Sequence, residues 1–242
     1  MDSSGYPYSA VPSAGFVTSS FRNDELMPKI AQAGSRKVAG VIVRQVRRSE
    51  FGAAAQVLGR GMCDNPANLR VFQISDKQRR GQSLTRFFRV VLDGLYRRGL
   101  VLGAFRSDTL MGVCGVARPG FCQPTTIEKL CIVPVVACGN PLGTTVRMLK
   151  WAADWARRDP PKLHWHVGPV VVDPVFQSQG VGGAMLAAFC ASIDQYAAHA
   201  YLETDKCRNV RFYQRFGFEV TAQAEVLGVT NWFMSRAPRQ LL

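Results

Sequence analysis

The sequence predicts an α/β fold in which strands and helices alternate along the chain. Three observations support this prediction. Apolar and β-branched runs of strand length, such as residues 41–46, alternate with longer segments in which apolar residues recur every three or four positions. Polar or glycine-rich turns separate these segments. Finally, 47% of the 242 residues are apolar, which is enough to form the core of one domain of ordinary size.

The first half of the chain is predicted to form a strand, two helices and a hairpin. Ser49 can cap a helix, and the Asp64-Asn65-Pro66 segment ends it. A hairpin follows where two apolar runs flank the polar pair Ser107-Asp108. The predicted elements are a strand at 41–46, helices at 49–62 and 83–97, and hairpin strands at 100–105 and 110–117.

The second half is predicted to begin with a long irregular connection at 119–143, a kind of loop that is usually functional or mobile. In the predicted helix at 144–157, we expect Leu149 and Ala152 to face inward, with Trp155 or Ala156. Residues 218–226 alternate between apolar and polar, which predicts a half-buried strand. The other predicted elements are a strand at 164–172, a helix with an apolar stripe from Leu186 to Ala197, a strand at 201–204, a short helix before Gly217 and a strand at 231–235.

Residues 1–39 lack sustained periodicity and are predicted to be a disordered tail with a short helix at 23–32, followed by one domain at 40–242. The tail begins with Ser, Gly, Pro and Tyr and lacks the basic-then-apolar order of a signal peptide. No apolar run reaches the roughly 20 residues that span a membrane. Seven scattered cysteines without a Cys-x-x-Cys pair favour reduced thiols over disulfides or a metal site. We therefore expect a cytoplasmic protein with no metal and no membrane contact.

The charge of the chain is strongly positive, with 30 Lys and Arg against 17 Asp and Glu, a net +13. Such a surface can attract nucleic acid or an anionic cofactor. No basic motif interleaved with aromatic residues accompanies the charge, so nucleic acid is the less favoured partner.

The most informative segment is the turn that follows the apolar strand at 170–172. It contains Gln177-x-x-Gly180-x-Gly182 and leads into a helical pattern. Glycines let the backbone close around an anion, and the helix start offers unpaired N–H groups, so the turn predicts a pyrophosphate site. It has neither the Gly-x-Gly-x-x-Gly of a dinucleotide fold nor the Gly-Lys-Ser/Thr of a P-loop. The residues expected to bind the pyrophosphate are Gln177, Ser178, Gln179, Gly180, Val181, Gly182 and Gly183.

This turn resembles motif A of the GNAT superfamily of N-acetyltransferases, which holds the diphosphate of coenzyme A. A second motif follows about thirty residues later, where Tyr213-x-x-x-Gly217-Phe218 matches the tyrosine motif of the same superfamily. The longer pattern from Leu202-Glu203-Thr204 through Asn209 to Val220 resembles the puromycin N-acetyltransferase-like branch. The resemblance implies a mixed central sheet whose fourth and fifth strands splay around an acyl-CoA site, with helices on both faces.

The resemblance also implies an acetyl-CoA-dependent N-acetyltransferase. The expected acceptor is a primary amine of a small molecule, which attacks the acetyl group directly in a ternary complex. By the same resemblance, Val171 and Val172 hold the pantetheine arm and Asn209 contacts the cofactor. Tyr213 is the candidate general acid, because a phenol with a pKa of about 10 can protonate a leaving thiolate.

The general base stays open between His166, Glu203 and a water-relayed or absent base. His164 lies on the same strand face as His166, because side chains of a strand repeat with period two. The acceptor is expected to lie among residues 62–66, Phe72, the 119–143 segment and the 226–232 turn, which carry few acids. That composition disfavours a polycationic acceptor such as an aminoglycoside.

The sequence leaves other functions open. The acceptor could be a protein lysine or an N-terminal amine. A non-catalytic module that binds acyl-CoA or nucleic acid belongs to a different class, although intact Gly180, Gly182 and Tyr213 favour an enzyme. Formation of a homodimer is likewise left open.

Overall fold

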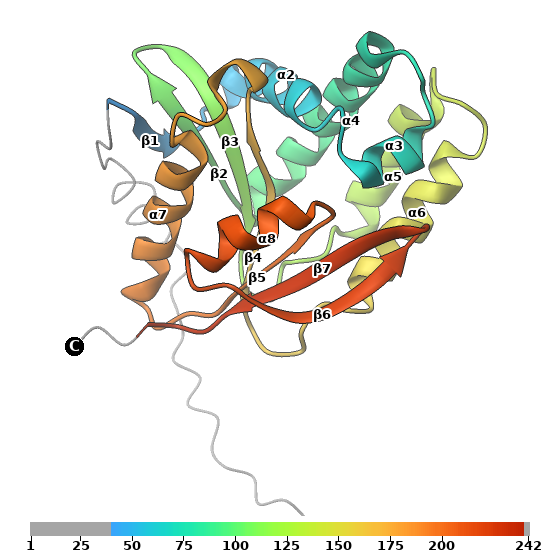
Figure 1. The fold of residues 1–242 in the computed structure, drawn as a ribbon. Helices are drawn as coiled ribbons and strands as arrows, with labels where there is room; N and C mark the ends of the chain where they lie inside the picture. Colours follow the sequence, from blue (N-terminus) through green and yellow to red (C-terminus); the bar gives the residue numbers. More distant parts are fainter. Residues whose placement is uncertain (1–39, 240–242) are drawn as a thin grey trace, which may run out of the picture.

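A mixed seven-stranded sheet, in the order β1-β2-β3-β4-β5-β7-β6, forms the centre of the molecule in the computed structural model, which describes residues 40–239 (Figure 1). The tail at 1–39 and its predicted helix at 23–32 lie outside the described residues. The strands are β1 (Ile42–Gln45), β2 (Gly99–Arg106), β3 (Thr109–Ala117), β4 (Trp165–Val172), β5 (Ala200–Thr204), β6 (Glu219–Val226) and β7 (Val229–Arg236). The helices are α2 (Phe51–Gly61), α3 (Pro66–Phe72), α4 (Lys77–Arg98), α5 (Thr126–Ala137), α6 (Thr144–Ala156), α7 (Val181–Asp194) and α8 (Cys207–Gln214), with short 3-10 turns at Arg48–Glu50 and Pro174–Phe176.

The strands β4 and β5 run parallel and then separate. Their pairing is limited to Trp165 with Ala200 and His166 with Tyr201, whereas β4 stays paired with β3 as far as Val172. The register between β3 and β4 shifts at Gly168 and Pro169, which is the position of a bulge, and bulges bend a strand. The other strand pairs are antiparallel. The predicted mixed sheet with splayed fourth and fifth strands is therefore confirmed.

Helices cover both faces of the sheet, as predicted (Figure 1). On one face Phe189 of α7 packs in a core with Leu102 and Cys114, all completely buried. On the other face α2 and α4 pack against Val101 and Val113. Neighbouring strand residues alternate between the two cores, because successive side chains of a strand point to opposite faces.

The region before β2 contains one helix more than the sequence predicted. Pro66 was interpreted only as the end of the preceding helix, but it also begins α3, where a proline loses no hydrogen bond because the first helical N–H has no partner anyway. The next helix begins at Lys77 instead of 83, since the Asp76 carboxylate caps it by accepting from the Arg79 N–H at 2.6 Å.

The prediction of an irregular connection at 119–143 was wrong, because α5 lies within it. Thr125 and Glu128 form a capping box, in which Glu128 N–H donates to Thr125 Oγ1 at 3.2 Å and Thr125 N–H donates to Glu128 Oε2 at 2.7 Å. Glu128 also pairs with Arg98 at the end of α4, at 3.2 Å. The helix is therefore capped locally and joined to α4.

Three burial predictions also need correction. In α6 the side chains of Leu149 and Ala152 are exposed, and Met148 and Trp151 contact the cores instead. Of the alternatives Trp155 and Ala156, Trp155 contacts a core and Ala156 is exposed. The strand β6 is mostly exposed because it forms the edge of the sheet, and within it only Val226 is buried. The helix α7 ends at Asp194, which leaves Ala197 exposed beyond it.

Residues 40–239 form no helix that has both the length and the apolar character needed to span a membrane. The seven cysteines, all of which lie within the described residues, are unpaired in the structure.

We predict that Glu50→Gln lowers the free energy of unfolding at pH 7 by about 1 kcal/mol, a value that allows for solvent screening of a partly exposed pair. Hydrogen bonds from Arg44, reinforced by the Arg47 N–H, outweigh burial and lower the pKa of Glu50 from 4.5 to about 2. A carboxyl with a lowered pKa stabilises the fold above its unfolded-state pKa, and this contribution is lost as the pH falls toward the folded-state pKa.

The difference in unfolding free energy between Glu50→Gln and the unchanged protein should therefore shrink from pH 4.5 toward pH 2 in denaturant titrations. Glu225→Gln on the exposed edge strand is the matched control and should have no such effect. A difference that stays constant over this pH range would contradict the assignment.

Candidate active site

The turn between β4 and α7 has the backbone geometry of an anion site. Ser178 and Gly180 have positive φ angles, of 62° and 80°, and Gly180 is the N-cap of α7. The first helical hydrogen bond runs from Ala184 N–H to Gly180 O at 2.9 Å. The N–H groups of residues 181–183 therefore have no acceptor within the helix and point out of its positive end.

The glycines keep the space in front of this helix end open. A Cβ on Gly180 would meet no atom within 4 Å, so its place is open space, but the φ angle there disfavours any other residue. A Cβ on Gly182 would lie 3.4 Å from both Phe212 and Val172, which form the walls. Larger side chains at either position would fill the space that a diphosphate needs.

A groove of about 750 Å³ extends from this helix end between β4 and α8. Most of the residues predicted to bind the cofactor line it, namely Val171, Val172, Gln177, Ser178, Gly180, Val181, Gly182, Gly183 and Asn209. The predicted residue Gln179 is not among those lining the groove, and its side-chain amide donates to the Val175 carbonyl at 3.2 Å. The Gln177 amide donates to the Val172 carbonyl at 3.1 Å and so connects the turn to the end of β4.

Three cations that the sequence analysis missed also line the groove: Lys206, Arg208 and Arg215. Burial, together with the neighbouring charge of Arg208, lowers the pKa of Lys206. Arg208 and Arg215 are exposed, and neither forms an ion pair with another described residue. Arg208 and Arg215 are seven residues apart, which is about two helical turns, so the sequence could have suggested that both side chains lie on the same face of the helix.

A second, smaller cavity of about 250 Å³ lies on the other side of the splayed strands. It is lined by aromatic side chains of α4 and α6, by residues 122–124 and by His166, Glu203 and Asp205. The residues that line both the groove and the cavity are Met62, Asn65, Val170, Asn209 and Tyr213. The two spaces therefore meet beside Tyr213.

Tyr213 is held firmly at this junction. Only 6% of the residue is exposed, and its ring packs edge-on against Phe212 and Phe218, with ring centroids at 5.2 and 6.0 Å. Burial, together with the charges of nearby Cys114 and Asp205, raises the pKa of Tyr213. Its hydroxyl therefore carries a proton at neutral pH.

His166 and Glu203, the two candidate bases, lie against each other where the strands separate. His166 Nε2 is 2.9 Å from Glu203 Oε2, and the Glu203 side chain is only 3% exposed. Burial alone would lower the pKa of His166, but the charge of Glu203 and the contact with Asp159 outweigh it and hold that pKa well above its usual range. His166 Nδ1 and Glu203 Oε1 are both buried without a hydrogen-bond partner.

The structure brings together only part of the region that the sequence predicts to bind the acceptor. Met62, Asn65 and residues 122–124 line the cavity, whereas Phe72 and residues 226–232 do not. In their place, four aromatic residues of α4 and α6 line the cavity: Phe87, Phe88, Trp151 and Trp155.

Asp205 holds α3 and Asn65, which form part of the cavity wall, in place. One of its carboxylate oxygens accepts from the Ala67 N–H at the start of α3, at 2.8 Å. This contact fixes α3, and with it Asn65, beside the end of β5.

Comparison with known proteins agrees with this geometry. Residues 135–220, which contain both motifs, match the model of the acetyltransferase (GNAT) domain. The chain is similar to a solved structure described as histone acetyltransferase HPA2 and related acetyltransferase from Corynebacterium glutamicum, with 19% identity, a TM-score of 0.62 and coverage of 84% of this chain and 98% of that one. It is also similar to an agmatine N-acetyltransferase, with 13% identity, a TM-score of 0.53 and coverage of 82% and 99%. At these identities the structures show the shared fold.

The splayed sheet and the matched domain define a protein with the GNAT fold. The free helix end, the open glycine positions and the three cations fit a cofactor that carries a diphosphate. Together with the domain match over residues 135–220, this geometry supports an N-acetyltransferase that uses acetyl-CoA.

We predict that replacing both Arg208 and Arg215 by Gln raises the Kd for acetyl-CoA about tenfold at low salt, a loss of about 1.4 kcal/mol. The reason is that both cations face the groove without a carboxylate partner among the described residues. Since exposed charges are screened, the effect should decline as salt is added.

Isothermal titration calorimetry at several salt concentrations measures this effect. Arg97→Gln removes an exposed cation at the end of α4, away from the groove, and should leave the Kd unchanged. An equal loss of affinity in the control would contradict a local role for the two arginines.

Proposed function

We propose that the protein acetylates a primary amine of a small molecule, by direct attack of the amine on the acetyl group within a ternary complex. The observation that carries this proposal is the junction at Tyr213, where a basic groove suited to acetyl-CoA meets a cavity that has four aromatic side chains from α4 and α6 in its wall and is also lined by Glu203. Acetyl-CoA supplies the activated acetyl thioester. The residues around the junction bind the amine and move protons.

Tyr213 is the proposed general acid, with its hydroxyl donating a proton to the departing sulfur. Three features support this role: the hydroxyl carries a proton at neutral pH, the ring is fixed by its neighbours, and the side chain borders both spaces. Val171 and Val172 are proposed to hold the pantetheine arm, since β4 has no β5 partner beyond His166. Asn209, which donates to Thr204 Oγ1 at 3.3 Å, is proposed to contact the cofactor from α8.

Glu203 is the proposed binding group and proton acceptor for the amine. Glu203 lines the cavity and its Oε1 is buried without a partner, so an ammonium group that reached this oxygen would supply the missing donor. His166 is better suited to hold Glu203 in place than to act as the base. Its Nε2 is occupied by Glu203, and its Nδ1 is buried, 3.7 Å from Asp159 Oδ1.

The cavity favours a small amine with an aromatic or apolar body. Its volume of about 250 Å³ is slightly below the common range for small-molecule sites of about 300–1,000 Å³. The tryptophan pair of α6, Trp151 and Trp155, can pack against an apolar body or against a cation. We also propose the puromycin N-acetyltransferase-like branch, on the residues from Leu202 to Val220 that resemble it.

We predict that Tyr213→Phe lowers kcat by about 10²- to 10⁴-fold, because the variant cannot protonate the leaving group. The Kd for acetyl-CoA should change less than threefold, roughly 0.6 kcal/mol. The rate at which free coenzyme A thiol is released gives kcat, and calorimetry gives the Kd for acetyl-CoA. Tyr96→Phe on the outside of α4 is the matched control. Parallel losses of kcat and cofactor affinity in Tyr213→Phe would disprove its role as the acid.

We predict that Glu203→Gln raises KM for the amine at least tenfold and lowers kcat, with the Kd for acetyl-CoA unchanged, because Glu203 lines the cavity but not the groove. The amide can still accept from His166, so the fold should be retained. Glu219→Gln at the exposed start of β6 is the control. Unchanged kinetics in Glu203→Gln would remove this carboxylate from the site.

The class of acceptor can be tested with a panel of amines that includes small aromatic amines, aminonucleosides, polyamines, aminoglycosides and lysine-containing peptides. Turnover that is highest with the aromatic monoamines and aminonucleosides would support the proposal. Turnover confined to peptides would establish a protein acetyltransferase instead. Binding of acetyl-CoA without turnover on any of these amines would contradict the proposed acceptor class.

A further inference from the structure

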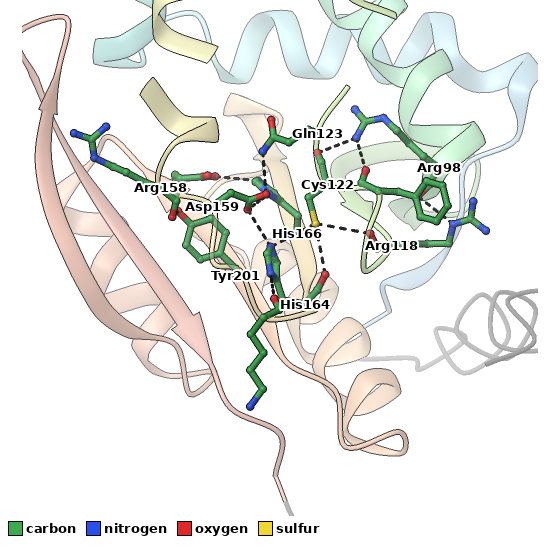
Figure 2. Close-up of polar contacts among 12 residues, drawn as sticks. Arg98, Arg118, Cys122, Gln123, Arg158, Asp159, His164, His166 and Tyr201 are labelled. Atoms are coloured by element: carbon green, nitrogen blue, oxygen red, sulfur yellow. Dashed lines mark hydrogen bonds and ion pairs between the residues drawn. The ribbon is translucent and has the colours of Figure 1, made fainter. Parts of the chain in front are cut away.

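Four side chains with metal-binding atoms meet behind the wall of the acceptor cavity. Cys122 lies in the connection between β3 and α5, Asp159 lies between α6 and β4, and His164 and His166 lie at the start of β4. Figure 2 shows the four side chains pointing toward one another. One ligating atom from each of them lies within 4.8 Å of all the others. The mechanism proposed above uses none of Cys122, Asp159 or His164.

Three of the six distances between these atoms are close to the edges of a zinc tetrahedron, and the others are within 4.8 Å. With Zn–N and Zn–O bonds of about 2.0–2.2 Å and Zn–S bonds of about 2.3 Å, neighbouring ligand atoms are separated by about 3.3–3.6 Å. His164 Nε2 lies 3.1 Å from Asp159 Oδ1 and 3.4 Å from Cys122 Sγ, and His166 Nδ1 lies 3.7 Å from the same Asp159 oxygen. Small side-chain movements would bring the four atoms to bonding distance of one central ion.

The outward-facing atoms of the same side chains have the partners that metal ligands usually have. A histidine that binds a metal commonly donates its other ring N–H to a carboxylate or to a backbone carbonyl. His166 Nε2 faces Glu203 at 2.9 Å, and His164 Nδ1 faces the Lys162 carbonyl at 2.7 Å. Asp159 Oδ2 accepts from the Gln123 amide at 3.1 Å (Figure 2). These partners leave His166 Nδ1, His164 Nε2 and Asp159 Oδ1 directed at the common centre.

Hydrogen bonds within this cluster leave one of its nitrogens, His166 Nδ1, without a partner. The separation of 3.7 Å between His166 Nδ1 and Asp159 is too long for a hydrogen bond, and Nδ1 is buried without a partner. The Cys122 thiol lies 3.4 Å from His164 Nε2 and 3.6 and 3.8 Å from the carbonyls of His164 and Arg118, so its single proton can serve only one of these three neighbours. A divalent cation would bind all of these groups together and would displace the protons that they carry.

We propose that Cys122, Asp159, His164 and His166 form a Zn²⁺ site that stabilises the acceptor cavity. A thiolate, two imidazoles and a carboxylate are ligands of zinc, and Ca²⁺ or Mg²⁺ would require oxygen ligands. Four protein ligands close the coordination sphere, which is the pattern of a structural site and not of a catalytic one. The ion joins the connections before α5 and after α6 to β4. Cys122, Gln123 and His166 all line the cavity, which gives the ion a path of entry.

The test uses the full-length chain, stripped of metal with a chelator and titrated with Zn²⁺ or with Co²⁺ as a spectroscopic probe. We expect one equivalent of Zn²⁺ to bind and to raise Tm. Co²⁺ should give the intense visible bands of a tetrahedral site and a thiolate-to-metal charge-transfer band. Cys122→Ser should abolish that charge-transfer band and raise the Kd for Zn²⁺ at least about 100-fold, and Gln123→Ala, which removes an outer partner, should raise it about tenfold.

Cys131→Ser is the matched control, since Cys131 is an exposed, unpaired thiol on α5. It should bind Zn²⁺ and Co²⁺ like the unchanged protein. Asp159→Asn, which keeps the shape of the side chain, provides a second test in case Cys122→Ser does not fold. It should also weaken Zn²⁺ binding. Failure of the unchanged chain to bind one equivalent, or equal affinity in Cys122→Ser and the unchanged chain, would overturn the proposal. These readouts do not depend on acetyl transfer, so the test of the metal site and the tests of the proposed function can fail separately.

Discussion

The separation of β4 from β5 is the constraint on which the rest of the structure depends. Pairing ends after His166 and Tyr201, so backbone groups of both strands beyond that point lack the partners that a sheet normally supplies. The bulge at Gly168 and Pro169 bends β4 while β3 remains paired with its end. A ligand can therefore bind between the strands, and the sheet still holds both sides of the opening in fixed positions.

The two sides of this opening carry side chains of opposite charge. On the groove side the cations Lys206, Arg208 and Arg215 surround the free end of α7, whereas the cavity side presents the carboxylate of Glu203. An anionic donor and a cationic amine are thus each attracted to a different side of the sheet, which the net charge of +13 alone would not explain. Tyr213 lies where the groove and the cavity meet, which is the position that the proposed general acid would need between two separately bound molecules.

The sequence predicted most of the elements but only part of the site. The features that it predicted are formed by residues close together in the sequence, whereas the features that it missed join residues far apart in the sequence. The glycine turn and the tyrosine motif are local patterns, so Gly180, Gly182 and Tyr213 could be identified from spacing and resemblance. The helix α5 was also within reach, because Thr125 and Glu128 have the spacing of a capping box. The contact between His166 and Glu203 and the cluster around Asp159 join residues from separate elements, and no periodicity in the sequence encodes them.

The burial of Glu203 links stability to binding at this site. A carboxylate that is 3% exposed and has one oxygen without a partner is costly to the folded protein, because burial removes water that nothing replaces. His166 offsets part of that cost by its contact with Oε2, but it is itself buried and depends on neighbours for its orientation. Side chains from the connections beside α5 and α6 provide that support. The remaining unfavourable free energy is that of Oε1, so an ammonium group that bound to this oxygen would relieve a cost that the folded protein already carries.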